Sequence, residues 1–289
     1  MLTFFAVSLR ILTNPLSNVF QKQLIIGRSS PFFINFLTYL SLSIVSIPYA
    51  SGIDWRQFPL DFWLVAALVG ILGAFGNGFL LKSLQYGELS VLGPINAYKS
   101  VVSMAGGLFL LRELPSLAGC GGIVFIILGS YFVLDSSKEK FSWALFKRAD
   151  IQYRCGAMVL TAIEAVFIKR IVLLSSPDTA FVTWCWFGAV FSSGLLLLNP
   201  NIVIKVQFRT AALNFRKYCL IIICVGLMQL STNYSFRAIP VAYALSLFQL
   251  SALVSVFFGS HFFNEETLYR KLLGAGIMVL GSVIIILLK

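Results

Sequence analysis

Charged residues are scarce in this sequence, and histidine is almost absent. Asp, Glu, Lys and Arg make up 11% of the 289 residues, whereas they make up about 25% of a typical soluble domain. The one histidine, His261, and the five cysteines lie apart along the chain, without a C-x-x-C or Cys/His pattern. These absences argue against a zinc site and against a disulfide framework. No metal and no cofactor is predicted.

Motifs for catalysis and for nucleotide hydrolysis are missing as well. Covalent catalysis needs a nucleophile paired with a base, and the sequence shows neither such a pair nor a cluster of carboxylates. The phosphate-binding loop G-x-x-x-x-G-K-[ST] is absent, which argues against ATP-driven work by this chain alone. The sequence therefore predicts a protein that is not an enzyme.

What the sequence does contain is a series of long apolar runs. Hydrophobic residues make up 58% of the chain and the mean hydropathy is +0.90, more apolar surface than a soluble fold of this size can bury. A helix that crosses the hydrocarbon core needs roughly 20 residues. Ten spans are expected, at residues 3–25, 31–49, 61–84, 89–111, 115–134, 153–173, 179–198, 218–237, 241–263 and 268–288. The sequence thus predicts an all-α membrane protein with ten transmembrane helices in a lipid bilayer.

The first of these runs is read as a span and not as a cleavable signal. Arg10, Asn14 and Pro15 interrupt Met1–Ile26, which leaves no short uninterrupted apolar region of the kind that signals contain. The net charge of +11 comes mostly from basic residues between the apolar runs, where they face headgroups and set topology. Nucleic acid is therefore not expected as a partner.

An internal repeat divides the chain into two halves. An offset of 152 residues brings Ser83 onto Ser235, and Glu113 onto Glu265. An offset of 147 brings Lys22 onto Lys169. Each half holds five expected spans, so the second half begins on the opposite face of the membrane, as in the inverted repeats of secondary transporters. We expect a first repeat at 1–135, a polar connector at 136–152 and a second repeat at 153–289.

The repeated stretches resemble the EamA-like branch of the drug/metabolite transporter superfamily. The resemblance rests on Ser83-Leu-Gln-Tyr-Gly-Glu-Leu-Ser-Val-Leu-Gly-Pro94 followed by Leu110-Leu-Arg-Glu113, on the second copy from Ser235 to Glu265, and on the polar opening from Asn14 to Lys22. It implies two inverted five-helix repeats with a central cavity between spans 1–4 and 6–9. It also implies transport of small metabolites, which in this superfamily include amino acids, sugars, nucleotide-linked and phosphorylated sugars, and drugs.

Two signals disagree about the orientation of the chain. The resemblance implies that both termini lie in the cytoplasm. Fourteen of the 22 Lys and Arg residues, however, lie in the odd-numbered connections or at their edges, against six in the even-numbered connections and at the C-terminus. By the positive-inside rule the odd-numbered connections face the cytoplasm and both termini lie outside, and this orientation is preferred.

Two ionisable residues are expected near the bilayer midplane. Lys99 lies about ten residues into the fourth span and Glu164 about eleven residues into the sixth. Such a charge costs roughly 2.5–3.5 kcal/mol on insertion scales, so it usually faces a cavity or a partner. We expect Lys99 to attract an anionic group of the substrate, and Glu164 to bind an amine or carry a proton. The alternative is a structural ion pair between the two. Arg10 is a weaker candidate because its side chain can reach the interface.

Lysines on the fourth and ninth spans are implied for the sugar-phosphate branch of the superfamily, and Lys99 resembles the first of them. Its repeat partner is Ser251, and the ninth span has no lysine, which argues against a phosphate cargo. Neutral polar side chains are candidates for the same site, although each of them can equally serve as a hydrogen bond between helices. They are Asn14, Asn18, Asn77, Asn96, Tyr98, Gln229, Asn233 and Gln249.

Three further patterns have a structural interpretation. Trp184 and Trp186 are assigned to an interfacial aromatic belt. Glycines of the third, fifth and tenth spans are assigned to close helix packing. Glu113 and Glu265 are expected to cap the helices that begin after them, the fifth and tenth spans, because a carboxylate is stabilised by the free N–H groups of a first turn.

These observations favour a secondary transporter of small polar metabolites that works by alternating access around a midplane cavity. An amino-acid-like cargo leads, since Lys99 and Glu164 together match a zwitterion. Anionic sugar derivatives and drug-like compounds are the alternatives, and a non-transporting membrane scaffold or receptor is the third class. The expected location is the cell membrane of a bacterium. The sequence leaves open coupling to a proton or another ion, and a homodimer.

Overall fold

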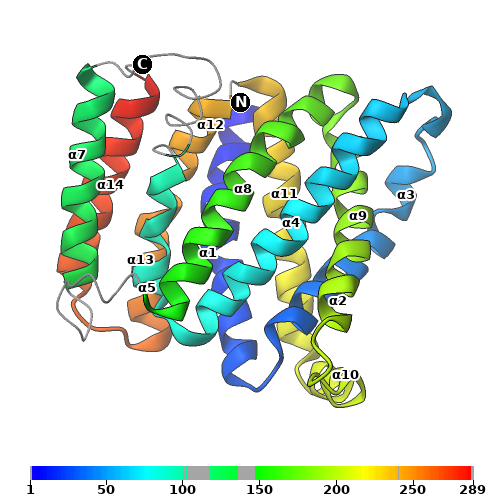
Figure 1. The fold of residues 1–289 in the computed structure, drawn as a ribbon, viewed down its shortest axis with the longest axis horizontal. Coiled ribbons are helices and arrows are strands. Elements are labelled where there is room, and N and C mark those ends of the chain that lie inside the picture. Colours follow the sequence, from blue (N-terminus) through cyan, green and yellow to red (C-terminus); the bar gives the residue numbers. More distant parts are fainter. Residues whose placement is uncertain (1, 100–101, 103–116, 136–146, 240, 288–289) are drawn as a thin grey trace.

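The computed structural model describes residues 2–99, 102, 117–135, 147–239 and 241–287, and every element in these ranges is a helix (Figure 1). In chain order the elements are α1 (Leu2–Ile26), α2 (Pro31–Val45), α3 (Ile47–Ala50), the 3-10 helix η1 (Trp55–Gln57), α4 (Leu60–Tyr86), α5 (Leu89–Leu92), the 3-10 helix η2 (Pro94–Ala97), α7 (Leu117–Asp135), α8 (Ala149–Leu174), α9 (Pro177–Leu197), α10 (Ile204–Leu213), α11 (Phe215–Ala238), α12 (Val241–Phe248), α13 (Ser251–Phe263) and α14 (Leu268–Leu287).

Local sequence signals explain several of these boundaries. Pro31 and Pro177 are the first residues of α2 and α9. The first N–H groups of a helix have no partner within it, so a proline, which lacks this group, costs no hydrogen bond there. The hydroxyl of Ser176 accepts a hydrogen bond from the Thr179 amide at 3.0 Å and so caps α9. Most long helices therefore begin within a few residues of the expected spans.

Three expected spans are not single helices in the described residues, so the count of ten is not confirmed. The span at 31–49 is divided into α2 and α3. The part of 89–111 that is described forms the short α5 and η2, which breaks at Pro94 because proline cannot donate a backbone hydrogen bond. The span at 241–263 is divided between α12 and α13 at a turn around Gln249. In addition, the connection expected at 199–217 contains α10.

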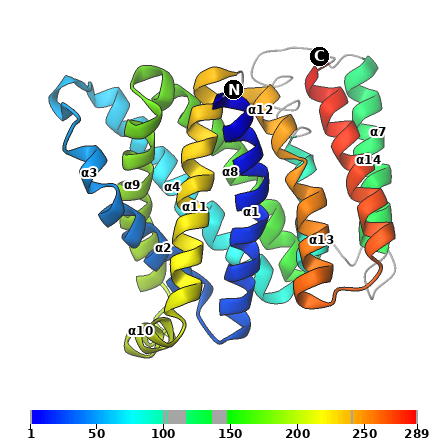
Figure 2. The same ribbon diagram turned by 180° about the vertical axis from the view of Figure 1, so that it is seen from behind.

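The long helices pack in reciprocal pairs. Helix α1 of the first half lies along α11 of the second half, and α8 of the second half lies along α4 of the first. Helix α2 packs against α9, and α7 packs along α14 at the edge of the bundle (Figures 1 and 2). Figure 1 shows α1 and α8 running in opposite directions. Corresponding helices of the two halves thus exchange partners.

Glycines allow the closest of these contacts. A methyl group on Gly129 of α7 would lie 2.5 Å from the carbonyl oxygen of Gly274 on α14, and one on Gly281 would lie 2.5 Å from the carbonyl oxygen of Gly122. Both distances are too short for an alanine, so the two backbones touch at these points. This confirms the interpretation of these glycines as packing positions.

By length and composition, three helices of the described residues can each cross a membrane unaided, namely α4, α9 and α11. The N- and C-terminal ends lie at one end of the bundle, and the turns after α1, α4 and α13 lie at the other (Figure 1). Helix α10 also lies at this second end, where it runs across the direction of the long helices (Figures 1 and 2).

Glu265, in the turn between α13 and α14, holds the second end of the bundle together. Its carboxylate accepts hydrogen bonds from the Lys22 ammonium of α1 and from the backbone amides of Leu89 and Ser90, each at 2.8 Å. The expectation that Glu265 caps the tenth span is therefore wrong. It caps α5 instead, because the chain folds the first turn of α5 against this loop. Its repeat counterpart Glu113 lies outside the described residues.

A second ion pair lies beside the first. The Lys271 ammonium of α14 donates to the Glu88 carboxylate at 2.6 Å and to the Ser90 hydroxyl at 2.9 Å. A methyl group on Gly259 would lie 2.4 Å from the Glu265 carboxylate, so only glycine fits there. The two pairs therefore join α1, α5, α13 and α14 and close this end of the bundle around them.

We expect Glu265→Gln to destabilise the protein by about 1–3 kcal/mol, because the substitution leaves the buried Lys22 ammonium without its counter-charge. Burial alone would raise the pKa of Glu265, but the charge of Lys22 and the hydrogen bonds from Lys22 and Ser90 outweigh it, so the pKa is lowered. The stabilisation should be complete above the pKa of an unfolded glutamate, about 4.3. It should be lost as the pH falls through the lowered value of the folded protein.

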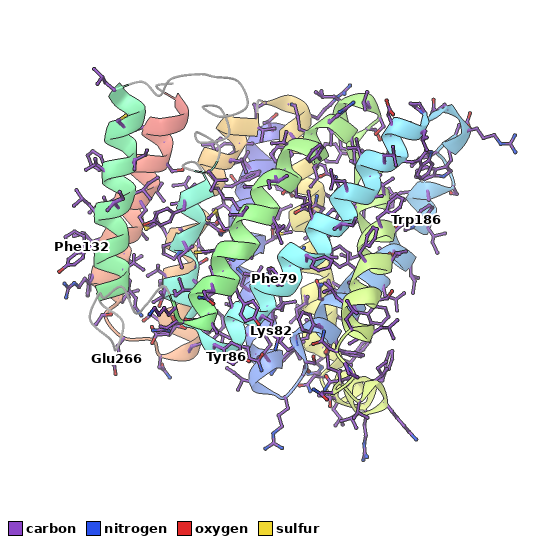
Figure 3. The ribbon with its side chains drawn as sticks, viewed as in Figure 1. Phe79, Lys82, Tyr86, Phe132, Trp186 and Glu266 are labelled. Carbon is purple, nitrogen blue, oxygen red and sulfur yellow. The ribbon has the colours of Figure 1, made fainter. Side chains whose placement is uncertain are left out.

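Thermal unfolding in detergent from pH 3 to pH 7 measures this effect. The matched control is Glu266→Gln, the exposed neighbour in the same turn (Figure 3), which should unfold like the wild type at every pH. Equal stability of Glu265→Gln and Glu266→Gln at pH 7 would contradict the role of Glu265.

Candidate substrate-binding cavity

A polar cavity lies inside the bundle, between helices of both halves. Its volume is about 90 Å³. It is lined by residues of α1, α4, α8, α9, α11 and α12 and of the segment around η2: Arg10, Asn14, Asn18, Asn77, Leu80, Asn96, Lys99, Arg154, Ala157, Thr161, Glu164, Ala165, Ile168, Trp184, Met228, Gln229, Thr232, Phe236, Leu245 and Phe248. Arg10 and Glu164 each lie well inside a long helix, so the cavity is at membrane depth.

Four ionisable side chains face this cavity, three of them basic and one acidic. Arg10, Lys99 and Arg154 carry positive charge and Glu164 carries negative charge, so the lining has a formal charge of three minus one, or +2. Their arrangement attracts an anionic group and offers one carboxylate to a cationic one. No group of three His, Cys, Asp or Glu side chains in the described part of the chain can hold a metal ion.

Glu164 is held by a network of aromatic and amide groups. The indole N–H of Trp184 donates to its carboxylate at 2.8 Å, and the ring of Tyr39 packs against Trp184 with centroids 4.6 Å apart. The side-chain amide of Asn77 donates to the Tyr39 hydroxyl at 2.7 Å. A methyl group on Gly73 would lie 2.6 Å from the Glu164 carboxylate. Glycine at that position therefore leaves the space in which Glu164 meets Trp184.

Arg10 stays inside the bundle and does not reach the interface. Its Nε donates to the Thr232 hydroxyl at 3.0 Å, and its guanidinium carbon lies 4.9 Å from the centre of the Phe248 ring. One terminal nitrogen, NH1, is buried without a hydrogen-bond partner among the described residues. A buried donor of this kind costs free energy until a ligand or water satisfies it. Arg10 is thus a stronger candidate than the sequence indicated.

Lys99 and Glu164 line the same cavity without forming a direct pair. No ion pair within 4 Å joins them, although both residues are described. The alternative in which the two charges only stabilise the bundle by pairing is therefore not what the structure shows. Both groups are available to a molecule in the cavity.

Of the ten residues expected at the site, the structure brings seven together. Asn14, Asn18, Asn77, Asn96 and Gln229 line the cavity with Lys99 and Glu164. Tyr98, Asn233 and Gln249 do not. Asn233 is turned toward α9, where its amide donates to the Pro177 carbonyl and its oxygen accepts from Gln229. Gln249 is buried in the turn between α12 and α13.

Sequence reasoning missed several lining residues. Trp184 was assigned to an interfacial belt, which is wrong: its side chain is 2% exposed and bonds Glu164. Arg154, at the start of the expected sixth span, is not among the expected site residues, but it is 3% exposed and its Nε donates to the Leu92 carbonyl at 2.7 Å. The helical spacing of residues 154, 157, 161, 164 and 168 on α8 places Arg154 on the same face as Glu164, and this signal would have found it.

A smaller cavity of about 20 Å³ extends the site toward α2. It shares Asn14, Asn18 and Asn77 with the main cavity and adds Gln21 and Asn35, so amide groups dominate its polar lining. The side-chain oxygens of Asn18 and Gln21 are buried without a hydrogen-bond partner among the described residues. This extension therefore offers neutral hydrogen-bonding groups and no charge.

We expect Trp184→Phe to destabilise the protein by about 1–3 kcal/mol, because it leaves the buried Glu164 carboxylate without its donor. The matched control is Trp186→Phe, two residues along α9, where the ring packs against Trp55 with centroids 5.3 Å apart (Figure 3). Within the described residues the Trp186 indole donates to no carboxylate. Thermal unfolding in detergent compares the two. An equal loss in both variants would show that ring packing, and not the hydrogen bond, is responsible.

Comparison with known proteins gives one family, one curated relative and a shared fold. A protein of known crystal structure matches 99% of this chain and 96% of its own with a TM-score of 0.64 at 16% identity, which shows a common fold. The S-adenosylmethionine uptake transporter of Rickettsia conorii (strain ATCC VR-613 / Malish 7) is 29% identical over 127 residues. That match spans 42% of this chain and 41% of the relative.

The family match covers both halves of the sequence. The profile of the EamA-like transporter family matches residues 11–135 and again residues 151–287. The family and the relative are transporters and not enzymes, and the apolar helices agree with a multi-pass membrane protein. The chain therefore belongs to the EamA-like transporter family, as its repeated motifs predicted.

Proposed function

We propose that this chain is a secondary transporter of small polar metabolites that carry an amino-acid group, and that it works by alternating access. The observation that carries the proposal is the central cavity, in which Arg10, Lys99 and Arg154 face the same space as Glu164. An amino-acid group presents a carboxylate and an ammonium. The three cations would bind the carboxylate, and Glu164 would bind the ammonium beside Trp184.

The packing of the helices supports alternating access. We propose ten spans in two inverted repeats, at 1–135 and 153–289, joined by the connector at 136–152. The exchange of partners between α1–α11 and α8–α4 is what a two-fold axis in the membrane plane would produce. Rocking of one repeat against the other would expose the cavity to each side in turn. The ion pairs of Glu265 and Lys271 close one end in this structure and would open in the opposite state.

The curated relative is consistent with this substrate class. Its name describes uptake of S-adenosylmethionine, a molecule with an amino-acid end. A proton exchanged at Glu164 would couple transport to a proton gradient, and this coupling and a homodimer stay predictions. We place the protein in the cell membrane with the basic connections toward the cytoplasm, because positive connections are retained on that side.

An anionic sugar derivative is the second candidate. The observation in its favour is the formal charge of +2 on the cavity lining. This charge is larger than the single positive charge that would balance the carboxylate of a substrate. Such a cargo has no ammonium, so it would bind without help from Glu164. The two candidates therefore differ in how they depend on this one side chain.

A thermal-shift screen of purified protein tests the proposal. An amino-acid compound at a hundredfold excess over its Kd should stabilise the wild type by about 2.7 kcal/mol. Lys99→Gln should remove this shift because it weakens binding of the carboxylate, and Glu164→Gln should remove it because it weakens binding of the ammonium. For a sugar phosphate, Lys99→Gln should remove the shift and Glu164→Gln should preserve or increase it.

Saturable uptake into proteoliposomes is the companion measurement. The control is Lys205→Gln on α10, an exposed cation outside the cavity, which should transport like the wild type. A ligand shift that survives both cavity substitutions would place the site elsewhere. Neither a shift nor saturable uptake for any compound would favour a non-transporting scaffold.

A further inference from the structure

A second cavity opens at the end of the bundle opposite the termini. Its volume is about 490 Å³, and it is bounded by the turn between α1 and α2, the end of α4 and the segment that joins α9 to α10. It shares no lining residue with the substrate cavity. In Figures 1 and 2, α10 lies beneath α2 and α9 at this end. The cavity therefore opens where the long helices leave the hydrocarbon core.

Two cations face this cavity without a matching carboxylate. Arg28 and Lys82 line it, and no Asp or Glu is among its lining residues. Neither cation has a carboxylate oxygen within 4 Å among the described residues. Lys82 lies near the end of α4, close to Tyr86 (Figure 3). The neutral polar side chains of Ser30 and Gln85 also line the cavity, and the Lys82 ammonium donates to the Gln85 side-chain oxygen at 3.3 Å. A cavity lined by two cations and no carboxylate suits an anion.

Arg28 has a backbone conformation that arginine rarely adopts. Its φ is +67°, in the left-handed region, directly after Gly27 at the end of α1. This conformation at the end of a helix is ordinarily taken by glycine, and a side chain there costs free energy. The glycine is present, but one residue too early to relieve the strain. The Arg28 and Ser29 amides close the end of α1 in this conformation by donating to the Ile25 and Leu24 carbonyls, each at 3.0 Å.

Apolar side chains also line the cavity. Ile25, Phe32, Ile202, Val203 and Val206 do so, and the polar side chains of Asn199, Asn201 and Gln207 lie among the last three. Val203 and Val206 are exposed on the surface. The cavity therefore offers apolar surface as well as two cations. A free anion would use only the cations.

Helix α10 has the character of an interfacial helix. Lys205 and Arg209 are exposed and four residues apart on α10, so they lie on one face of the helix beside the cavity, and Arg216 follows in the first turn of α11. Phe208 packs edge-on against Phe33 at 5.0 Å, and the Gln207 side chain accepts a hydrogen bond from the Ser30 amide at 2.8 Å. These contacts fix α10 against the start of α2. A basic amphipathic helix in this position lies at the surface of the bilayer.

We propose that this cavity binds the headgroup of an anionic phospholipid, with its phosphate between Arg28 and Lys82 and the start of its acyl chains along Val203 and Val206. Basic pockets between spanning helices bind such headgroups on the cytoplasmic side of membranes. The cavity lies at the end that carries the excess of basic connections. The site is separate from the transported substrate and does not depend on its identity.

Titration of the purified full-length protein in neutral detergent with fluorescent phosphatidylglycerol tests the site. We expect saturable binding of this lipid and weaker binding of phosphatidylcholine. The double variant Arg28→Gly/Lys82→Gln should bind phosphatidylglycerol about thirtyfold more weakly, from about 1 kcal/mol for each cation lost. Glycine fits the backbone at position 28, so the variant should unfold at no lower temperature than the wild type in lipid-free detergent.

Control measurements separate the site from unspecific attraction. Arg56→Gln removes an exposed cation in η1, between α3 and α4 and outside the lining of this cavity, and should leave the affinity unchanged. Equal loss in Arg56→Gln and the double variant, or none in either, would overturn the proposal. So would displacement of the lipid by millimolar glycerol phosphate or inorganic phosphate, since that result would identify a site for a soluble phosphate.

Discussion

Charges inside a helix bundle that lies in lipid are the constraint on which the rest of this structure depends. An ionised side chain at membrane depth is stable only where polar groups or water replace bulk water. The bundle meets this requirement by gathering Arg10, Lys99, Arg154 and Glu164 around one cavity. Trp184 and Thr232 supply hydrogen bonds to two of the four. The cavity thus allows these side chains to stay charged at membrane depth, and it is also the place where a polar molecule can replace water.

The two halves of the chain contribute unequally to that cavity. Arg10 and Lys99 come from the first half, whereas Glu164 and Arg154 come from a single face of α8 in the second. The repeat positions do not carry equivalent charges, since Ser251 stands where the first half has Lys99. A symmetric frame therefore holds an asymmetric site. Such asymmetry would let the site distinguish the carboxylate of an amino-acid group from its ammonium.

The two ends of the bundle differ as well. One end is tied by Lys22–Glu265 and Lys271–Glu88, both of which join the first half to the second. The Glu265 carboxylate of the second half thereby holds α1 and α5, and the Glu88 carboxylate of the first half holds α14. At the same end, Arg28 and Lys82 have no carboxylate oxygen within 4 Å in the part of the chain that the structure describes. The two ion pairs thus join the halves of the bundle, whereas Arg28 and Lys82 line the second cavity.

The sequence by itself determined the lipid environment, the repeat, the family and most of the long helices, because these follow from local composition and from patterns repeated along the chain. It also indicated Lys99 and Glu164, since a charge in an apolar run is visible without coordinates. It did not determine the breaks at 45–47 and 248–251, nor the partners of the side chains. Trp184 looks the same in sequence whether it faces headgroups or Glu164, and Glu265 looks the same whether it caps α14 or α5. Those choices depend on which helices touch. Trp184 and Glu164 are 20 positions apart and Glu265 and Leu89 are 176 apart, and only the tertiary structure decides that they come into contact.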